Sequence, residues 1–165
     1  MALLAAGCNK KGDSGTPGAG SVTSSTTTPA ATGITGKIKG KPFTGKVARV
    51  VPDSEGGNPT LYIVGYDATC EKISFIPPQG QNRATVTAPL TKGTTKLDGD
   101  KIFAELSMWD DKGKISTSAT SPKGEIEWIT VPTDKTKGLV RVSLTHGELD
   151  TKLDGSMEAD LCPKQ

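Results

Sequence analysis

Short stretches of alternating apolar and polar residues, separated by glycine, proline and aspartate, recur along most of this chain. In the clearest of them, 102–109, the apolar residues Ile102, Ala104, Leu106 and Met108 share one parity. Side chains of a strand alternate between its two faces, so this parity predicts one face packed on a core. No segment shows the helical period of about 3.6 residues. The pattern therefore predicts an all-β fold, an antiparallel β-sandwich or partly closed barrel of about 8 strands.

The same pattern gives the expected elements. Strands are predicted in the alternating stretch 34–43, with a turn at Gly40-Lys41, and in 43–51, 61–66, 84–90, 102–109, 114–119, 125–131 and 139–145, followed by a last strand that ends at Cys162. Segment 61–66 is apolar on both faces, which predicts a central strand. Segments 110–113 and 121–124 are predicted turns, with Gly113 in the left-handed conformation.

One pentapeptide, Thr-Lys-Leu-Asp-Gly, occurs twice, at 95–99 and at 151–155. Apolar residues at alternate positions follow both copies. Each copy is therefore expected to form an Asp-Gly turn or a glycine bulge that opens a strand, and the two copies to occupy similar places in the sandwich. Two copies are too few to define a repeat architecture.

Residues 8–33 have the composition of a linker. Between Asn9 and Gly33 the chain is rich in glycine, serine, threonine and proline, with Val22 as a lone large apolar residue before Gly33 and no aromatic residue. Such a segment cannot bury enough apolar surface to offset its ordering entropy, so a disordered tether is expected. A coil of this length has an r.m.s. span of roughly 25–30 Å. The folded domain is expected to occupy 34–165.

The N-terminal residues Leu3-Leu-Ala-Ala-Gly-Cys8 resemble a bacterial lipobox, at which a signal peptidase cuts before a cysteine that receives lipid. The small residues Ala6 and Gly7 fit the requirement before the cut. Seven residues precede Cys8 and none is basic, so 1–7 are interpreted as a truncated signal peptide. The alternative is a short apolar N-terminus with an unrelated cysteine. Asn9 stands where enteric inner-membrane lipoproteins have aspartate, which by resemblance favours the outer membrane.

The chain has three cysteines. If Cys8 carries lipid, Cys70 and Cys162 remain as a pair, and in an oxidising compartment such a pair is expected to form a disulfide. On the chain-entropy model, a bridge that closes a loop of this length stabilises the fold by about 4–5 kcal/mol. Its geometry would bring the end of the central strand and the end of the last strand to the same end of the sandwich. The alternative is two buried thiols.

Two further motifs extend the lipoprotein resemblance. The domain opens with Gly36-x-Ile38-x-Gly40-Lys41-x-Phe43, and its last strand reads Gly155-x-Met-x-Ala-x-x-Cys162. With a central strand that leads to a cysteine, this arrangement resembles a class of bacterial lipoproteins that carry a β-sandwich. The resemblance implies a sandwich with the two cysteines joined, and it implies no activity.

A search for catalytic or metal-binding residues gives no site. The single histidine, His146, lies at the expected end of a strand, and no Gly-x-Ser-x-Gly elbow surrounds a serine. One histidine and a bridged cysteine pair cannot supply the ligands of a zinc site. Asp98, Asp100 and 110–111 are better explained as turn residues than as calcium ligands. Glu105, Glu125, Glu127 and Glu158 are candidate paired carboxylates for glycoside hydrolysis, but on alternating strands they are expected on a solvated face. No cofactor is therefore expected.

The tryptophans are the remaining candidate binding residues. Trp109 is in phase with Phe103, Glu105 and Ser107, on the face opposite the apolar one, and Trp128 follows Glu127. Side by side and exposed, the two indoles would offer a platform for a glycan or a proline-rich peptide. The alternative is that they belong to a second core layer or cap a loop.

These observations lead to one principal interpretation. The chain is expected to be a monomeric, non-catalytic lipoprotein of the bacterial cell envelope, anchored through Cys8, with an envelope protein or a glycan as partner. The alternative function is a glycan- or peptide-binding module using Trp109 and Trp128, and an enzyme is the third. The net charge of +2, with lysine and acidic residues interspersed, excludes a clustered basic face for nucleic acid.

Overall fold

The computed structural model describes residues 30–73, 76–109, 112–118 and 122–164. As predicted, the described chain is all-β, and it contains eleven strands and one turn of 3₁₀-helix. The elements are β1 (Gly33–Ile38), β2 (Lys41–Thr44), β3 (Val47–Val51), β4 (Thr60–Val64), β5 (Arg83–Thr87), β6 (Gly93–Lys96), β7 (Phe103–Trp109), β8 (Ile115–Ser118), β9 (Lys123–Thr130), β10 (Gly138–His146), the 3₁₀ turn η1 (Gly147–Leu149) and β11 (Thr151–Leu161).

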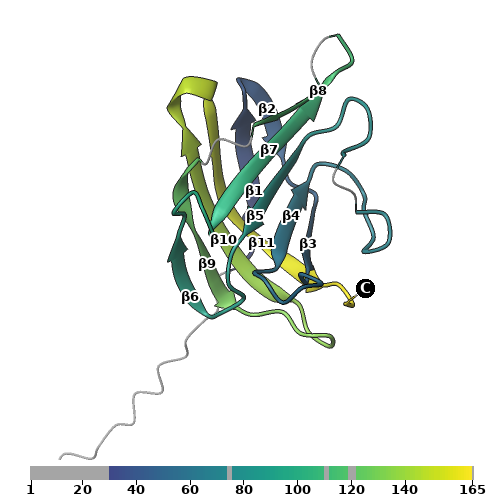
Figure 1. Cartoon of the computed structure of the whole chain (residues 1–165), viewed down its shortest axis with the longest axis vertical. Helices are drawn as coiled ribbons and strands as arrows, with labels where there is room; N and C mark the ends of the chain where they lie inside the picture. Colours follow the sequence, from purple (N-terminus) through teal and green to yellow (C-terminus); the bar gives the residue numbers. More distant parts are fainter. Residues whose placement is uncertain (1–29, 74–75, 110–111, 119–121, 165) are drawn as a thin grey trace, which may run out of the picture.

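The strands form one sheet that curls into a half-barrel (Figure 1). Their order is β6-β9-β10-β11-β3-β4-β5-β7-β8, with β1 paired to β11 and β2 paired to β1. We call β1, β2, β6, β9, β10 and β11 the first half-sheet, and β3, β4, β5, β7 and β8 the second half-sheet. The long strand β11 joins them, because it pairs with β10 and β1 along most of its length and with β3 at its end.

The pairing of β3 with β11 differs from the expected antiparallel pattern. It is parallel and joins two residue pairs, Arg49 with Asp160 and Leu161 with Val50, whereas β10 and β11 are paired over nine positions. All other strand pairs of the described residues are antiparallel. We call the β3–β11 pairing the parallel seam.

The core lies between the two half-sheets. Strand β7 places Ala104, Leu106 and Met108 in it, as the alternation predicts, and Ile102 packs against it. Strand β4 is central, between β3 and β5, and it is buried on both faces. Among the fully buried aliphatic side chains of this core, from both half-sheets, are Ile34, Ile38, Leu61, Ile63, Leu106, Ile126, Val140, Val142, Leu144, Leu153, Val50 and Val86.

The chain changes half-sheet within the predicted strand 43–51, which is in fact two strands. Gly45 lies between β2 and β3, and its N–H donates to the Ile34 carbonyl while the next N–H donates to Val64. A β-carbon on Gly45 would lie 2.8 Å from the Met157 sulfur, so glycine allows the chain to cross tightly packed core there. The preceding turn is Lys39-Gly40, one residue earlier than expected, and both of its residues have positive φ, as in a type I′ hairpin.

The two copies of the pentapeptide have different structures, so the prediction of similar places is wrong. In 95–99 the strand ends after Lys96, and Asp98 accepts hydrogen bonds from the N–H groups of Asp100 and Ile102 in a turn. Copy 151–155 lies wholly inside β11. The second copy lies between β1 and β10, which take its backbone hydrogen bonds. The first copy begins in β6, paired with β9, and the chain there turns away from β9 toward β7 in the other half-sheet.

Two other expectations at turns and boundaries need correction. Gly124 is not a turn residue but lies within β9, close against the Ser143 carbonyl. Thr32, which the composition assigns to the linker, is tied to β11: its N–H donates to the Ser156 hydroxyl, and the Ser156 N–H donates to the Thr32 hydroxyl, each at 3.2 Å. Ordered structure therefore begins before β1. Gly113 has φ of 70°, the left-handed conformation expected of it.

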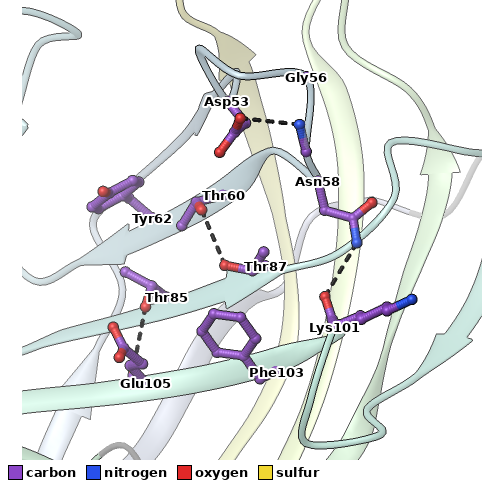
Figure 2. A pocket seen from close by; sticks show the side chains of 11 residues that line it. Asp53, Gly56, Asn58, Thr60, Tyr62, Thr85, Thr87, Lys101, Phe103 and Glu105 are labelled. Carbon is purple, nitrogen blue, oxygen red and sulfur yellow. Dashed lines mark hydrogen bonds between the residues drawn. The ribbon is translucent and has the colours of Figure 1, made fainter.

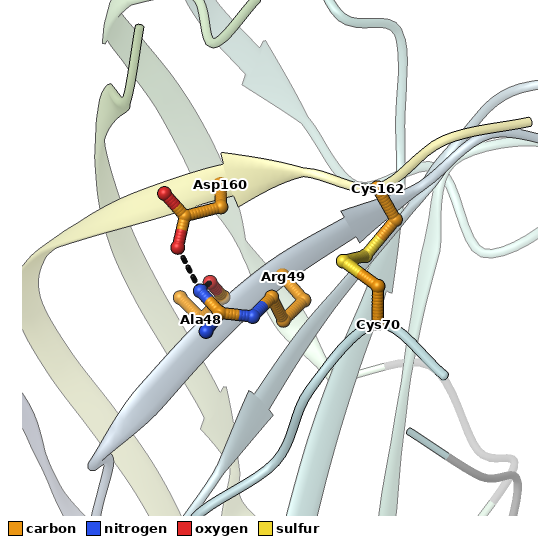
Figure 3. Close-up of a disulfide and its surroundings, with 5 residues drawn as sticks. All are labelled: Ala48, Arg49, Cys70, Asp160 and Cys162. Atoms are coloured by element: carbon orange, nitrogen blue, oxygen red, sulfur yellow. Dashed lines mark hydrogen bonds and ion pairs between the residues drawn. A yellow bond between two sulfur atoms is a disulfide. The ribbon is translucent and has the colours of Figure 1, made fainter. Parts of the chain in front are cut away.

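The predicted disulfide is present between Cys70 and Cys162, whose Cα atoms lie 5.4 Å apart (Figure 3). Its position differs from the prediction. Cys162 follows β11, and its N–H donates to Val50 on β3 at 2.8 Å. Since β11 is parallel to β3 and β4 is antiparallel to it, the end of β11 meets the beginning of β4 and not its end. The loop after β4 therefore returns along the sheet to reach Cys162.

Candidate functional site

The outer face of the second half-sheet, opposite the core, carries polar and aromatic side chains in three rows. The registers of β4, β5 and β7 define these rows as Thr60-Thr87-Phe103, Tyr62-Thr85-Glu105 and Val64-Arg83-Ser107. Because each row crosses adjacent strands, its side chains are neighbours on one surface. This face is the one on which the half-sheet can meet a ligand.

The third row is covered by the loop that carries Cys70, residues 65–73 and 76–82, which we call the Cys70 loop. Arg83 and Ser107 are 1% and 0% exposed although they face away from the core, and an Arg83 Nη donates to the Ser107 hydroxyl at 3.0 Å. The Arg83 guanidinium also lies 5.6 Å from the centre of the Tyr62 ring, within cation–π range. The Trp109 indole N–H donates to the Pro77 carbonyl at 2.9 Å. The loop is thereby held onto the sheet.

The other two rows line a groove of about 610 Å³ (Figure 2). Thr60, Thr87, Phe103 and Glu105 are partly exposed there, whereas Tyr62 and Thr85 are 5% and 3% exposed. The hydroxyls of Thr60 and Thr87 lie 3.0 Å apart and form a hydrogen bond on the floor. The Thr85 hydroxyl donates to the Glu105 carbonyl at 3.4 Å. Tyr62 and Phe103 lie at opposite sides of these threonines (Figure 2). The groove therefore has a threonine floor between two aromatic rings.

Two loops form the wall of the groove, and an aspartate orders each of them. In the β3–β4 loop, Oδ1 of Asp53 accepts from the N–H groups of Glu55 and Gly57, at 2.8 and 3.0 Å. In the loop before β7, Asp98 does the same for Asp100 and Ile102, at 2.9 Å each. The Asn58 amide donates to the Lys101 carbonyl at 3.1 Å and so ties the two loops together.

The electrostatics of this face follow from these contacts. Hydrogen bonds from the backbone of Gly57 and Glu55 hold the pKa of Asp53 below its ordinary 3.8, so it is charged at neutral pH. Burial raises the pKa of Tyr62, which stays a neutral phenol, and burial lowers the pKa of Arg83. Two carboxylates, Asp53 and Glu105, and one ammonium, Lys101, line the groove. This set offers hydrogen bonds without a strong field of either sign.

The structure contradicts the tryptophan platform and agrees with its alternative, in which the two indoles belong to a core layer or cap a loop. Trp128 is 2% exposed and belongs to the core on β9 of the first half-sheet. Trp109 ends β7 of the second half-sheet, is partly buried, and holds the Cys70 loop through Pro77. The phase predicted for Trp109 is correct, since it shares the outer face with Phe103 and Ser107. The two indoles nevertheless form no common surface, which removes the binding mode based on them.

Of the other candidate residues, those that the structure describes are spread over both half-sheets and the loop before β7. Asp98 organises a turn, as expected, and 110–111 lie outside the described residues, as does Cys8. His146 ends β10, on the first half-sheet. Glu127 and Glu158 pair with Arg141 and Lys137 on the exterior of that half-sheet, while Glu105 lies on the other. Among the described residues no three His, Cys, Asp or Glu side chains are placed to hold a metal.

Of the groove residues, the sequence indicates Glu105, as a candidate carboxylate, and the phase of Phe103, but not the groove itself, although a further signal exists. Segments 60–62, 85–87 and 103–105 carry threonine, aromatic or glutamate residues at alternate positions, outside the apolar parity of their strands. Segment 61–66 was interpreted as apolar on both faces, which is correct for burial but hides that Tyr62 faces outward. Recognising the groove requires the pairing of β4 with β5 and β7.

None of the three comparisons, with family models, with curated proteins and with solved structures, matches this chain. In the part of the chain that the structure describes, there is no helix with the length and apolar character of a membrane span.

Proposed function

We propose that this chain is a non-catalytic lipoprotein of the bacterial cell envelope, anchored by lipid on Cys8, that displays its all-β domain as an interaction module on a flexible linker. One observation carries the proposal. The chain has three cysteines, and the Cys70–Cys162 disulfide accounts for two of them. Disulfides persist in oxidising compartments outside the cytosol. Cys8 alone is then left for lipid, in the lipobox-like sequence.

The remaining parts of the proposal follow from the same arrangement. A lipidated N-terminal cysteine carries several acyl chains, each buried CH₂ contributing about 0.8 kcal/mol, so attachment is stable where a single chain would bind only marginally. Asn9 after the cysteine favours the outer membrane. A monomeric domain on such a linker can contact envelope proteins or glycans near the membrane surface. The separation of His146 and Glu105 on different half-sheets supports a binding role over a hydrolytic one.

The test is fractionation of a bacterial host that expresses the complete precursor and its Cys8→Ser variant. The unaltered protein is expected in the membrane fraction and to incorporate labelled palmitate, and the variant is expected in the soluble fraction without label. Cys70→Ser is the matched control, because it removes a cysteine without touching the lipobox. A Cys8→Ser protein that remained in the membrane fraction would refute the anchor.

A further inference from the structure

The groove on the outer face of the second half-sheet takes no part in the proposed anchoring. We propose that it binds a neutral oligosaccharide, with the Phe103 ring against the face of one sugar ring and the threonine floor and Glu105 hydrogen-bonded to sugar hydroxyls. The inference depends on the groove alone, so it stands or falls separately from the lipid on Cys8.

Phe103 is the aromatic residue of the groove whose ring a ligand can reach. Its side chain is partly buried, so part of the ring is accessible from the groove, whereas Tyr62 is 5% exposed and mainly forms the opposite wall. In Figure 2 the Phe103 ring lies beside Thr87 and Glu105. The face of an aromatic ring is electron-rich and apolar, and it suits the C–H groups on the face of a sugar ring. Phe103 is therefore the stacking residue.

The threonine hydroxyls on the floor of the groove match the hydroxyls of a sugar. A threonine hydroxyl both donates and accepts, as a sugar hydroxyl does, and a carboxylate such as that of Glu105 accepts from sugar hydroxyls. The hydrogen bond between Thr60 and Thr87 fixes the floor before any ligand arrives. Groups fixed in advance lose less entropy on binding. The floor is thus prepared for a ligand rich in hydroxyls.

Charge and shape decide between ligand classes. Two carboxylates and one lysine line the groove, which disfavours an anionic polymer. Strands β4 and β5, which carry the threonine floor, are paired on both sides, so the floor has no free strand edge to which a peptide could add as a further strand. Among the described residues, β8 pairs with β7 at Leu106–Trp109, beyond Phe103 and Glu105. A volume of about 610 Å³ lies within the roughly 300–1,000 Å³ of small-molecule sites. These observations favour a short neutral saccharide over a peptide.

The test is titration calorimetry on the full chain, carrying Cys8→Ser so that no lipid is attached. The probes are maltohexaose, cellohexaose, xylohexaose and N-acetylchitohexaose, with a proline-rich decapeptide as the competing class. At least one saccharide is expected to bind with a dissociation constant below about 1 mM. Phe103→Ala should weaken that binding at least tenfold, and Glu105→Gln, which keeps the side-chain shape, should weaken it at least threefold.

Trp109→Phe is the matched control, because it alters an aromatic residue on the same strand and face outside the groove. The affinity of this variant for the saccharide should be unchanged. Circular dichroism establishes whether each variant is folded. If Phe103→Ala does not fold, the saccharide affinity of Glu105→Gln tests the proposal. Three results would overturn the proposal: no saccharide binds below about 1 mM, binding persists in both groove variants, or the peptide binds in the groove and the saccharides do not.

Discussion

Arg49 and Asp160 face each other across the parallel seam and form an ion pair there (Figure 3). The seam is the strand pairing that joins the two half-sheets, and it contains two residue pairs, so this ion pair and the Cys70–Cys162 disulfide reinforce a short junction. The side chains are 22% and 35% exposed, so solvent weakens the pair without removing it.

The first prediction concerns this ion pair. A double-mutant cycle with Arg49→Met and Asp160→Asn should give a coupling of about 1 kcal/mol in the free energy of unfolding, measured with urea. The Lys46–Asp67 pair is the control, because its side chains are 56% and 82% exposed and its coupling should be near zero. If the coupling between Arg49 and Asp160 equalled that between Lys46 and Asp67, the ion pair at the seam would stabilise the fold no more than an exposed pair does.

The second prediction concerns the disulfide. Cys162→Ser, or reduction of the unaltered protein, should lower the free energy of unfolding by about 2–5 kcal/mol, because the bridge ties the Cys70 loop and the end of β11 together. Cys8→Ser should leave that energy unchanged. Thiol labelling of protein from the envelope, denatured without reductant, is expected to find neither Cys70 nor Cys162 reactive. Two reactive thiols would contradict the bridge.

The third prediction concerns Gly155, inside β11. A β-carbon there would lie 1.9 Å from the Gly33 carbonyl oxygen, and φ is 130°. Gly155→Ala should therefore push β1 away from β11 and destabilise the protein by more than about 2 kcal/mol in thermal or urea unfolding. Gly147→Ala is the control, since nothing lies within 4 Å of its β-carbon. If both variants melt at the same temperature, the close approach of β1 to β11 is wrong.

The fourth prediction concerns pH. Backbone N–H groups of Ile102 and Asp100 hold the pKa of Asp98 below its ordinary 3.8. A carboxyl whose pKa is lower in the folded state stabilises it above the unfolded pKa, and this contribution is lost as pH falls through the folded pKa. The melting temperature should therefore fall as the pH is lowered from 5 to below 3.8, and this fall should be less steep in Asp98→Asn. An equal drop in the unaltered protein and in Asp98→Asn would contradict this role of Asp98.

The sequence allowed the fold class to be predicted because burial on one face of a strand leaves an alternation that any reader can see, as at Ala104, Leu106 and Met108. The central position of β4 followed from its apolar residues on both faces. The disulfide followed from counting cysteines. These properties depend on residue type and on local spacing alone.

Properties that depend on which strands become neighbours could not be predicted in the same way. The pentapeptide at 95–99 is a strand end and a turn, and the identical pentapeptide at 151–155 is a strand, because their neighbours differ. The sequence left open whether Trp128 lies on a binding surface or in a core layer, and the pairing of the strands places it in the core. Phe103 acquires its place in the groove only from the pairing of β7 with β5. The parallel seam likewise left no mark on the sequence.

The neighbourhood of β1 and β11 also sets the order in which this domain can be completed. Thr32 and Ser156, whose hydrogen bonds hold the start of β1, are 124 residues apart in the chain. Strand β1 is paired with its neighbour β2 along one edge, and its second edge stays uncovered until β11, near the other end of the described chain, has formed. Contacts of such long sequence separation form slowly. Among the described strands, the one that comes first along the chain is thus among the last to be paired along both edges.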